Sequence, residues 1–254
     1  MSQDLSERAT RDRALFDDIA SEYAGKDLAP GQREARRHRL IQSIRCLDLT
    51  SNPEILEVGC GAGFSAEYLA GTFSRYKGID YSENLIAFAE HTHGGPGVEF
   101  ETADLNTLRE DETFDVILMI GLLHHLDDPV ASLTRLSRLL RPGGWLLANE
   151  PQSGNVLISV LRSIRKQVDD AYSADQDEFS APELLDMYQR AGLTDIRVRP
   201  QGVFSTPIAE VTLPSFVRAA AGVACRVDSY LENRFPAALK YVAWNLIACG
   251  RKPD

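Results

Sequence analysis

Cysteine is scarce in this sequence, and the few cysteines do not cluster. No Cys-x-x-Cys pair occurs among the four cysteines of the 254 residues, which are Cys46, Cys60, Cys225 and Cys249. This spacing argues against a disulfide framework and against a zinc site. We therefore expect no bound metal and a reducing, cytoplasmic location.

The sequence also has no long apolar run and no excess of basic charge. Its unbroken apolar runs, such as 116–120, are far shorter than the roughly 20 residues that span a bilayer, so we expect no membrane insertion. The start of the chain is polar and acidic, which argues against a secretory signal. The formal net charge of −10 argues against a nucleic-acid partner, because neutralising phosphates requires a basic surface.

What the sequence does contain is an alternation of short apolar and amphipathic segments, typical of a parallel sheet covered by helices. At 254 residues the chain is long enough for one such domain with an added cap. We predict a single α/β domain over 1–254 with a doubly wound sheet, and 114–121, the most apolar segment, as its central strand. The predicted strands are 54–58, 76–80, 98–104, 114–121, 145–150, 195–199 and 241–249.

Capping residues mark several helix boundaries. Ser82 and the Asp128-Pro129 pair have the residue types that begin helices, and Ser180 begins a capping box. A further helix is predicted over 64–73, directly after a glycine cluster. These helices fall between the predicted strands, as a doubly wound sheet requires.

Three segments fall outside this alternation and are predicted to form a helical cap: 1–37, 152–178 and 207–237. Their apolar residues recur at helical spacing, and the two later segments are not rich in glycine or serine, so we interpret them as structured elements. Three alternatives stand for their apolar faces: they enclose an acceptor, they belong to the core, or they form a dimer surface. The last of these would make the protein a homo-oligomer. The arginine run from Arg33 to Arg39 is either a solvated helix face or a contact to an anionic acceptor or lipid phosphates.

A glycine loop with the pattern Gly59-x-Gly61-x-Gly63 follows the first predicted strand. A strand, a glycine turn and a helix form a cofactor-binding edge, because glycines allow close backbone approach and the helix N-terminus offers unpaired N–H groups. Nicotinamide enzymes share this pattern, but they need a small residue where this chain has Phe64. With Glu57 ahead of it, the spacing is instead that of an S-adenosylmethionine loop.

An acidic residue stands at the end of each of the next two predicted strands. Asp80 can accept hydrogen bonds from both hydroxyls of a ribose, or it can cap a helix. Asp104 can accept a bond from an adenine amino group, or it can stabilise a turn. Their joint placement after a glycine loop favours cofactor binding for both.

These segments resemble a class I S-adenosylmethionine-dependent methyltransferase of the subgroup that includes small-molecule and quinone-pathway enzymes. The resemblance implies a Rossmann-like sheet with an antiparallel seventh strand, a cap over the carboxyl ends of the strands, and S-adenosyl-L-methionine as cofactor. It rests on five segments in the family's order within roughly 38–150, namely 55–63, 78–82, 102–105, 114–117 and 139–144.

The resemblance implies roles for the matched residues at the methionine end of the cofactor. Gly59 and Gly61 would line the methionine moiety, and Glu57 would fix the loop. Cys60 and Gly63 belong to the same cofactor-binding loop.

At the other end of the cofactor, the resemblance implies that Asp80 holds the ribose and Tyr81 packs on the adenine. Asp104 and Leu105 would bind the adenine edge. Ile120, at the end of the fourth strand, would offer a backbone carbonyl to the amino group of the cofactor.

Two histidines follow the fourth strand on the acceptor side. His124 and His125 are the candidates for a general base, which is needed only if the acceptor must lose a proton; the alternative is a role in loop structure. Near the N-terminus, the segment with Asp17 and Tyr23 resembles the cap of the same subgroup, in which the tyrosine closes over the cofactor. The alternative for that segment is a helix face packed on the domain.

We therefore predict an S-adenosylmethionine-dependent methyltransferase with a small-molecule acceptor, lipophilic molecules and secondary metabolites being candidates. A non-catalytic S-adenosylmethionine-binding accessory protein and a quinone-type carbon methyltransferase stay as alternatives. A nucleic-acid amino methyltransferase would carry an Asn/Asp-Pro-Pro-aromatic run where this chain has the segment 121–124. The sequence does not distinguish oxygen, nitrogen and carbon acceptors.

Overall fold

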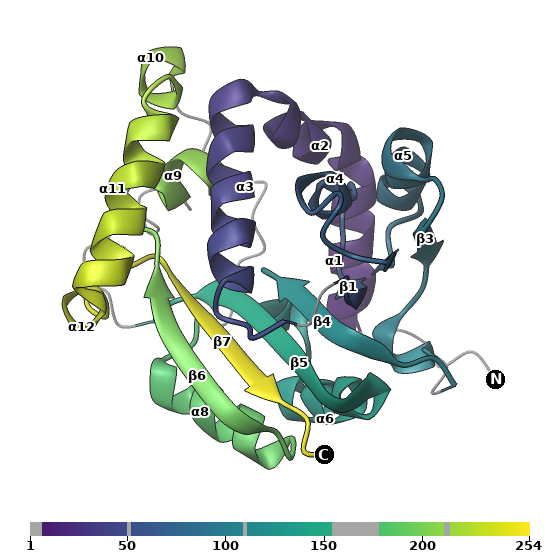
Figure 1. Cartoon of the computed structure of the whole chain (residues 1–254). Coiled ribbons are helices and arrows are strands. Elements are labelled where there is room, and N and C mark those ends of the chain that lie inside the picture. The colour runs from purple at the N-terminus through teal and green to yellow at the C-terminus, as the bar shows by residue number, and fades with distance from the viewer. Residues whose placement is uncertain (1–6, 50–51, 109–110, 154–177, 211–213) are drawn as a thin grey trace.

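A seven-stranded sheet forms the centre of the computed structural model, which describes residues 7–49, 52–108, 111–153, 178–210 and 214–254. The strand order is β3-β2-β1-β4-β5-β7-β6, and β7 runs antiparallel to both of its neighbours (Figure 1). This confirms the predicted fold class. The strands are β1 (Glu54–Val58), β2 (Arg75–Asp80), β3 (Val98–Thr102), β4 (Phe114–Ile120), β5 (Leu140–Pro151), β6 (Thr194–Gln201) and β7 (Asn245–Arg251).

The middle strand, β4, is buried on both faces, as its apolar sequence predicts. Ile117 and Met119 belong to the hydrophobic cluster on one face of the sheet, and Val116 and Leu118 belong to the cluster on the other. All four side chains are at most 1% exposed. The alternation follows from the two-residue period of a strand, and it fixes the register of the sheet between its two helical layers.

Helices cover both faces of the sheet (Figure 1). Ser82 accepts a hydrogen bond from the Leu85 backbone N–H, Asp128 accepts one from the Ala131 N–H, and Ser180 forms the predicted capping box. One face is covered by α6 (Pro129–Leu139) and α8 (Ala181–Arg190); the other is covered by α3 (Pro30–Ile44), α4 (Phe64–Tyr68) and α5 (Glu83–His93). No helix in the described ranges is long and apolar enough to cross a membrane.

Two predicted boundaries around the glycine turns are wrong. The helix predicted over 64–73 ends at Tyr68, because the chain turns through Gly71, whose φ of +78° does not fit a right-handed helix. The fifth strand begins at Leu140 rather than at Trp145, so it includes the Pro-Gly-Gly segment that was expected to separate helix from strand. A register shift opposite this segment absorbs it within the pairing of β4 and β5.

Two other strands are shorter than predicted. The third strand ends at Thr102, because Asp104 begins the short 3-10 helix η1 (Leu105–Thr107). The last strand begins at Asn245 rather than at 241, because the preceding residues complete a turn in which the Ala243 N–H bonds to the Leu239 carbonyl.

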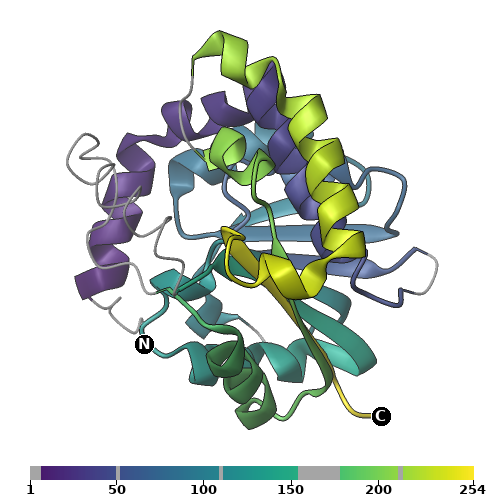
Figure 2. The same cartoon turned by 90° about the vertical axis from the view of Figure 1, so that its left-hand side faces the viewer.

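The two predicted cap segments that can be described are helical. The N-terminal one contains α1 (Glu7–Asp18) and α2 (Ala20–Leu28), followed by the start of α3. The second contains α9 (Ser205–Glu210), α10 (Ser215–Arg218), α11 (Ala221–Arg234) and α12 (Pro236–Leu239). Figure 2 shows α11 running alongside α3, and a small apolar cluster around Ala35 and Cys225 joins these helices. Almost all of 152–178 lies outside the described residues.

Candidate functional site

The carboxyl ends of four parallel strands lie at one edge of the sheet. Strands β1, β2, β3 and β4 are parallel to one another, so the loops that follow Val58, Asp80, Thr102 and Ile120 meet along this edge. In open α/β sheets such an edge is where ligands bind, next to the point at which the strand order reverses. That reversal lies here between β1 and β4.

The loop after β1 has a backbone that favours glycine at every second position. The φ angles of Gly59, Gly61 and Gly63 are +71°, +53° and +78°, in the left-handed region that side chains disfavour. The backbone N–H groups of Gly59 and Cys60 both donate to the Ile79 carbonyl, at 2.8 and 3.0 Å. The loop is therefore tied to the end of β2 and presents its backbone at the ligand-binding edge.

Glu57 supports this loop from inside the protein. The side chain is 2% exposed and accepts hydrogen bonds from the Ser65 hydroxyl at 2.9 Å and from the Tyr76 hydroxyl. Burial raises the pKa of Glu57 to about 7, although both hydrogen bonds oppose the shift. The carboxyl group joins β1, α4 and β2, so it is placed to hold the loop rather than to face a ligand directly.

Asp80 connects the loop after β1 with the loop after β2. One carboxylate oxygen accepts from the Gly61 N–H at 3.0 Å, and the other accepts from the Ser82 N–H at 2.9 Å. Burial raises the pKa of Asp80, and these backbone N–H donors oppose that shift. Each oxygen has a second lone pair, so the carboxylate can still accept from ligand hydroxyls. The half-buried Tyr81 follows directly.

The end of β3 carries the second predicted acidic residue. Asp104 is half-buried, and one of its oxygens accepts from the Asn106 N–H at 2.7 Å, as the turn interpretation predicts. The next residue, Leu105, is 6% exposed and belongs to the core. The structure therefore places both residues directly after the carboxyl end of β3, with one oxygen of Asp104 already engaged in capping η1.

Helix α2 brings Tyr23 onto the glycine loop. A Cβ added to Gly61 would lie 3.1 Å from Cε1 of Tyr23, so the ring rests against the loop backbone. The Arg36 guanidinium lies 5.1 Å from the centre of the same ring, and Phe16 meets it edge-on at 5.7 Å. Asp17 of α1 accepts a hydrogen bond from the Ser82 hydroxyl. The N-terminal helices thus cover the loop.

The loop after β4 contacts the glycine loop directly. A Cβ on Gly59 would lie 2.9 Å from Cδ1 of Leu122, which leaves no room for a side chain there. Gly121, whose φ is +71°, donates its N–H to the Asn149 carbonyl at 2.9 Å. The half-buried Ile120 stands immediately before this turn. The residues after β4 therefore border the same site as the glycine loop.

The two histidines of this loop are each held by a carboxylate. Nδ1 of His124 lies 2.6 Å from Oε2 of Glu150, and Nδ1 of His125 lies 3.0 Å from Oδ2 of Asp12. Burial lowers the pKa of His124, and the charges of His125 and Arg39 lower it further, against the opposing effect of Glu150. Both oxygens of Glu150 accept hydrogen bonds from backbone N–H groups, so we assign the His124 proton to Nδ1, which leaves Nε2 as an acceptor.

Several residues of this edge were not found from the sequence. Glu150, fully buried at the end of β5, accepts from the backbone N–H groups of Leu122 and Leu123 as well as from His124. A carboxylate at the end of an otherwise apolar strand was the available signal. Arg39 was noted only as part of an arginine run, and the sequence gives no sign that it reaches Asn149.

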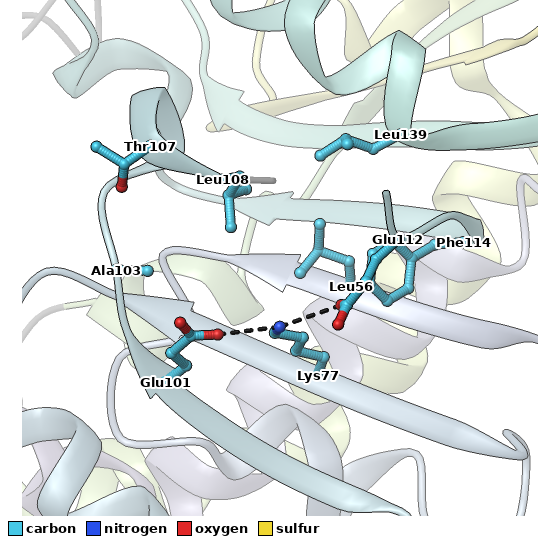
Figure 3. Close-up of a pocket in the computed structure, with 9 residues that line it drawn as sticks. All are labelled: Leu56, Lys77, Glu101, Ala103, Thr107, Leu108, Glu112, Phe114 and Leu139. Carbon is cyan, nitrogen blue, oxygen red and sulfur yellow. Dashed lines mark hydrogen bonds and ion pairs between the residues drawn. The ribbon is translucent and has the colours of Figure 1, made fainter. Parts of the chain in front are cut away.

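A pocket elsewhere in the protein has a different character. It lies beside the middle of the strands, and Lys77 within it pairs with Glu101 at 2.9 Å and Glu112 at 3.1 Å (Figure 3). Its other lining residues are mainly apolar and include Leu56 and Phe114. Since Lys77 is paired with two carboxylates and neither the glycine loop, Asp80 nor the histidine loop lines it, this pocket is not the candidate site. Among the described residues no cluster of side chains suits a metal ion.

A methyltransferase domain model matches residues 56–148 of the chain. The protein carries a class I S-adenosylmethionine-dependent methyltransferase domain. The match spans β1 to β5 and includes the glycine loop, Asp80 and the histidine loop. S-adenosylmethionine is the cofactor of this family. A protein of similar fold from Haemonchus contortus has been solved in complex with S-adenosylmethionine, and its TM-score against this chain is 0.59.

Curated relatives match the methyltransferase domain and little else. A phthiotriol/phenolphthiotriol dimycocerosates methyltransferase from Mycobacterium ulcerans is 36% identical over 108 residues, or 41% of this chain and 40% of the relative. A fatty-acid O-methyltransferase from Mycolicibacterium smegmatis is 40% identical over 37% of this chain and 35% of its own length. A ubiquinone biosynthesis O-methyltransferase from Thiobacillus denitrificans is 35% identical over 37% of this chain and 42% of its own length. The chain therefore matches less than half of each relative.

Solved structures resemble the methyltransferase domain together with its cap. A possible histamine N-methyltransferase from Thermotoga maritima has a TM-score of 0.65 at 21% identity, covering 94% of this chain and 98% of its own. Magnesium protoporphyrin IX methyltransferase from Synechocystis, with bound SAH, has a TM-score of 0.64 at 14% identity. The match covers 97% of this chain and 100% of that protein. At these identities the likeness concerns the fold alone.

Proposed function

We propose that this chain transfers a methyl group from S-adenosylmethionine to a small-molecule acceptor. The observation that carries the proposal is the contact pattern of the glycine loop at the sheet edge. Gly61 is bonded to Asp80 and covered by Tyr23, and Gly59 lies against Leu122 of the loop that contains His124. This arrangement combines close backbone approach, a ribose acceptor, an aromatic cover and a candidate base.

The cofactor would lie along the edge with its methionine part on the glycine loop. Gly59 and Gly61 provide backbone that a ligand can approach closely, with Cys60 and Gly63 completing the turn. Glu57 would hold the loop through Ser65 and Tyr76 without touching the cofactor.

The adenosine part would reach toward β2 and β3. The Asp80 carboxylate would accept from the ribose hydroxyls, and Tyr81 would pack against the adenine ring. Asp104 and Leu105 would border the adenine edge, and the Ile120 carbonyl would accept from the cofactor's amino group. The closeness of Tyr23 to Gly61 supports a role for α2 in covering the bound cofactor.

His124 is the proposed general base for an acceptor that must lose a proton. The sulfonium already makes the methyl electrophilic, so the protein mainly aligns the nucleophile and removes its proton. Burial lowers the pKa of His124, which favours the neutral ring, and the Nδ1 contact with Glu150 leaves Nε2 available to accept. His125 is less suited to this role, because its ring packs against Phe16 and pairs with Asp12 on the cap side.

Relatives named for fatty-acid, ubiquinone-pathway and phosphoethanolamine methylation support a small-molecule acceptor for this chain. Their printed reactions include both oxygen and nitrogen methylation, so the acceptor atom is not part of the proposal. The helical cap segments would enclose the acceptor and exclude water during transfer. The retained alternatives are a quinone-type carbon methyltransferase and a non-catalytic accessory protein.

The proposal is tested by incubating the protein with radiolabelled S-adenosylmethionine and a native cell extract. The label is then partitioned among organic, aqueous and macromolecular fractions, and label in a small-molecule fraction is expected. Asp80→Ala should remove the transfer, whereas Asp186→Ala, at an exposed position of α8, should not. Label found only in protein or nucleic acid would rule out the small-molecule acceptor, and cofactor binding without any transfer would favour the accessory protein.

A further inference from the structure

Helix α11 lies beside α3 at the outer edge of the molecule and carries apolar side chains on two opposite faces (Figure 1). Its inner face contributes Ala221 and Cys225 to the small cluster shared with α3. Its outer face is formed by Val223, Arg226, Val227, Tyr230 and Arg234. The two valines and the tyrosine follow the i, i+4, i+7 spacing of one helix stripe, and they are 62%, 39% and 62% exposed. An exposed apolar stripe of this kind marks an interaction surface.

An aromatic ring and a cation extend the outer face at the carboxyl end of α11. The rings of Tyr230 and Phe235 contact each other with their centres 6.2 Å apart, and Phe235 is itself exposed. The Arg234 guanidinium lies 5.7 Å from the centre of the Phe235 ring. Aromatic rings next to long cationic side chains are typical of residues at the boundary between water and an apolar phase.

The two carboxylates of α11 are directed away from this face. Asp228 is fully buried and accepts hydrogen bonds from the backbone N–H groups of residues 203–205. Glu232 is half-buried and accepts from the Gly202 N–H at 2.9 Å, and burial raises its pKa to about 7. Both acidic groups therefore hold the chain segment before α9 and leave the outer face without negative charge from this helix.

The cations of α11 face outward instead. Arg226 and Arg234 are exposed, and neither forms an ion pair with a residue that the structure describes. Glu34 of α3 lies beside Gly222, on the flank of α11 that meets α3. The outer face thus combines an apolar stripe with unpaired positive charge, on a protein whose formal net charge is −10.

This combination fits an anionic lipid surface. Apolar and aromatic side chains of a surface helix enter the boundary between headgroups and acyl chains, and arginines beside them bind lipid phosphates. The negative charge elsewhere on the protein opposes this contact little, because charges more than about 8–10 Å away are screened at physiological ionic strength. A second copy of the chain fits less well, since a two-fold contact would bring the arginines of one outer face against those of the other.

We propose that the outer face of α11 docks on an anionic phospholipid bilayer, with its apolar stripe at the headgroup boundary and Arg226 and Arg234 on lipid phosphates. The contact is peripheral and reversible, since no helix in the described ranges can span a membrane. Docking there is independent of methyl transfer, because none of these residues belongs to the candidate site.

The test mixes the full-length protein with vesicles of phosphatidylcholine alone, or of phosphatidylcholine and phosphatidylglycerol in equal parts. The bound fraction is measured by sedimentation. The protein should bind the anionic vesicles at least about tenfold more tightly than the neutral ones, as two arginines at an anionic surface allow. Added salt should weaken this binding, because it screens the attraction between arginine and phosphate. No binding to the anionic vesicles, or equal binding to both kinds, would overturn the proposal.

Two double variants separate the charge from the apolar contact. Arg226→Gln/Arg234→Gln should weaken binding to anionic vesicles at least about tenfold. Val223→Ser/Tyr230→Ser keeps both cations and should also weaken binding, because it removes the apolar stripe. Unchanged binding in both variants would refute the proposal.

Matched controls lie on α8, on the opposite side of the sheet. Arg190→Gln and Leu185→Ser change an exposed cation and an exposed apolar residue, and both should bind anionic vesicles like the wild type. Thermal unfolding of every variant is measured as well, and unchanged unfolding is expected because the replaced side chains are exposed. Equal losses of vesicle binding in the controls and in the outer-face variants would contradict a specific role for α11.

Light scattering without vesicles tests the other occupant of this face. The wild type should be a monomer under the conditions of the vesicle experiment. A dimer that Val223→Ser/Tyr230→Ser dissociates would show that a second copy covers the outer face, and it would overturn docking on lipid.

Discussion

The Glu150 carboxylate at the end of β5 accepts a hydrogen bond from Nδ1 of His124 at 2.6 Å. The same carboxylate accepts from the Leu122 and Leu123 N–H groups at 3.1 and 2.8 Å, so it orients the whole loop after β4. One buried acidic residue therefore sets both the loop conformation and the ring nitrogen that is free to accept a proton.

Replacing His124 by Gln should reduce methyl transfer about 100-fold or more, in keeping with the usual contribution of a positioned base. His125→Gln is the matched variant and should reduce it far less, because His125 pairs with Asp12 on the cap side. Transfer is measured with radiolabelled cofactor and the extract fraction that accepts the label. Similar losses in the two variants would contradict a specific role for His124.

The pH profile adds a readout that loop structure alone would not change. Burial lowers the pKa of His124. The midpoint of the acidic limb in the pH–rate profile should therefore lie below the ordinary histidine pKa of about 6.5. Glu150→Gln removes the carboxylate that stabilises the protonated ring, so the limb should move to still lower pH while the maximal rate falls. An unchanged limb in Glu150→Gln would show that the carboxylate acts only on the loop.

Glu57 should make the free energy of unfolding depend on pH. Its pKa is raised to about 7 in the folded protein, so the stabilising effect of the protonated form is complete below about pH 4.5 and is lost as the pH rises through 7. Glu57→Gln keeps one acceptor oxygen and puts an N–H donor in place of the other, and it should remove this dependence because an amide does not titrate. Between pH 5 and pH 7.5, urea unfolding should show the wild type losing about 2 kcal/mol more than the variant.

A change at an exposed carboxylate provides the control for that experiment. Glu90→Gln on α5 removes the same charge from the surface and should follow the wild-type pH dependence. If Glu57→Gln and the wild type lose stability in parallel, the buried carboxyl group is not the source of the effect.

Asp80→Ala should weaken S-adenosylhomocysteine binding by a few kcal/mol, measured by calorimetry. The variant removes the proposed ribose acceptor and also leaves the Gly61 and Ser82 N–H groups without their partner, at about 1–3 kcal/mol for each unsatisfied buried group. Asp80→Asn keeps one acceptor oxygen and should lose less. Normal binding by both Asp80→Ala and Gly61→Val would mean that the cofactor lies elsewhere.

Tyr23 should act through its ring rather than through its hydroxyl. The ring rests on Gly61, whereas the hydroxyl makes only a 3.4 Å contact with Arg36. Tyr23→Phe should therefore bind S-adenosylhomocysteine within about twofold of the wild type, and Tyr23→Ala should bind it about tenfold more weakly, a difference of about 1.4 kcal/mol. Equal affinities in all three proteins would limit α2 to packing on the domain.

Much of the fold was determined by short-range features of the sequence. The apolar run at 114–121 predicted the central strand, and Ser82 and Ser180 predicted helix starts, because strand burial and capping depend on residues within a few positions. The glycine spacing likewise predicted a loop whose three glycines all have positive φ. Boundaries such as Leu140 were missed, because pairing with a neighbouring strand extended β5 through the Pro-Gly-Gly turn signal.

The acceptor side of the candidate site was decided by tertiary structure alone. Arg39 and Asn149 are 110 positions apart, and His124 and Glu150 are 26 apart. No local pattern indicates such pairs, because a side chain's partner depends on which strand ends and cap helices come together. The sequence thus determined the sheet, the glycine loop and the acidic residues at the strand ends. Only the packing of α3 and β5 around Gly121 determined which charged groups lie beside this loop.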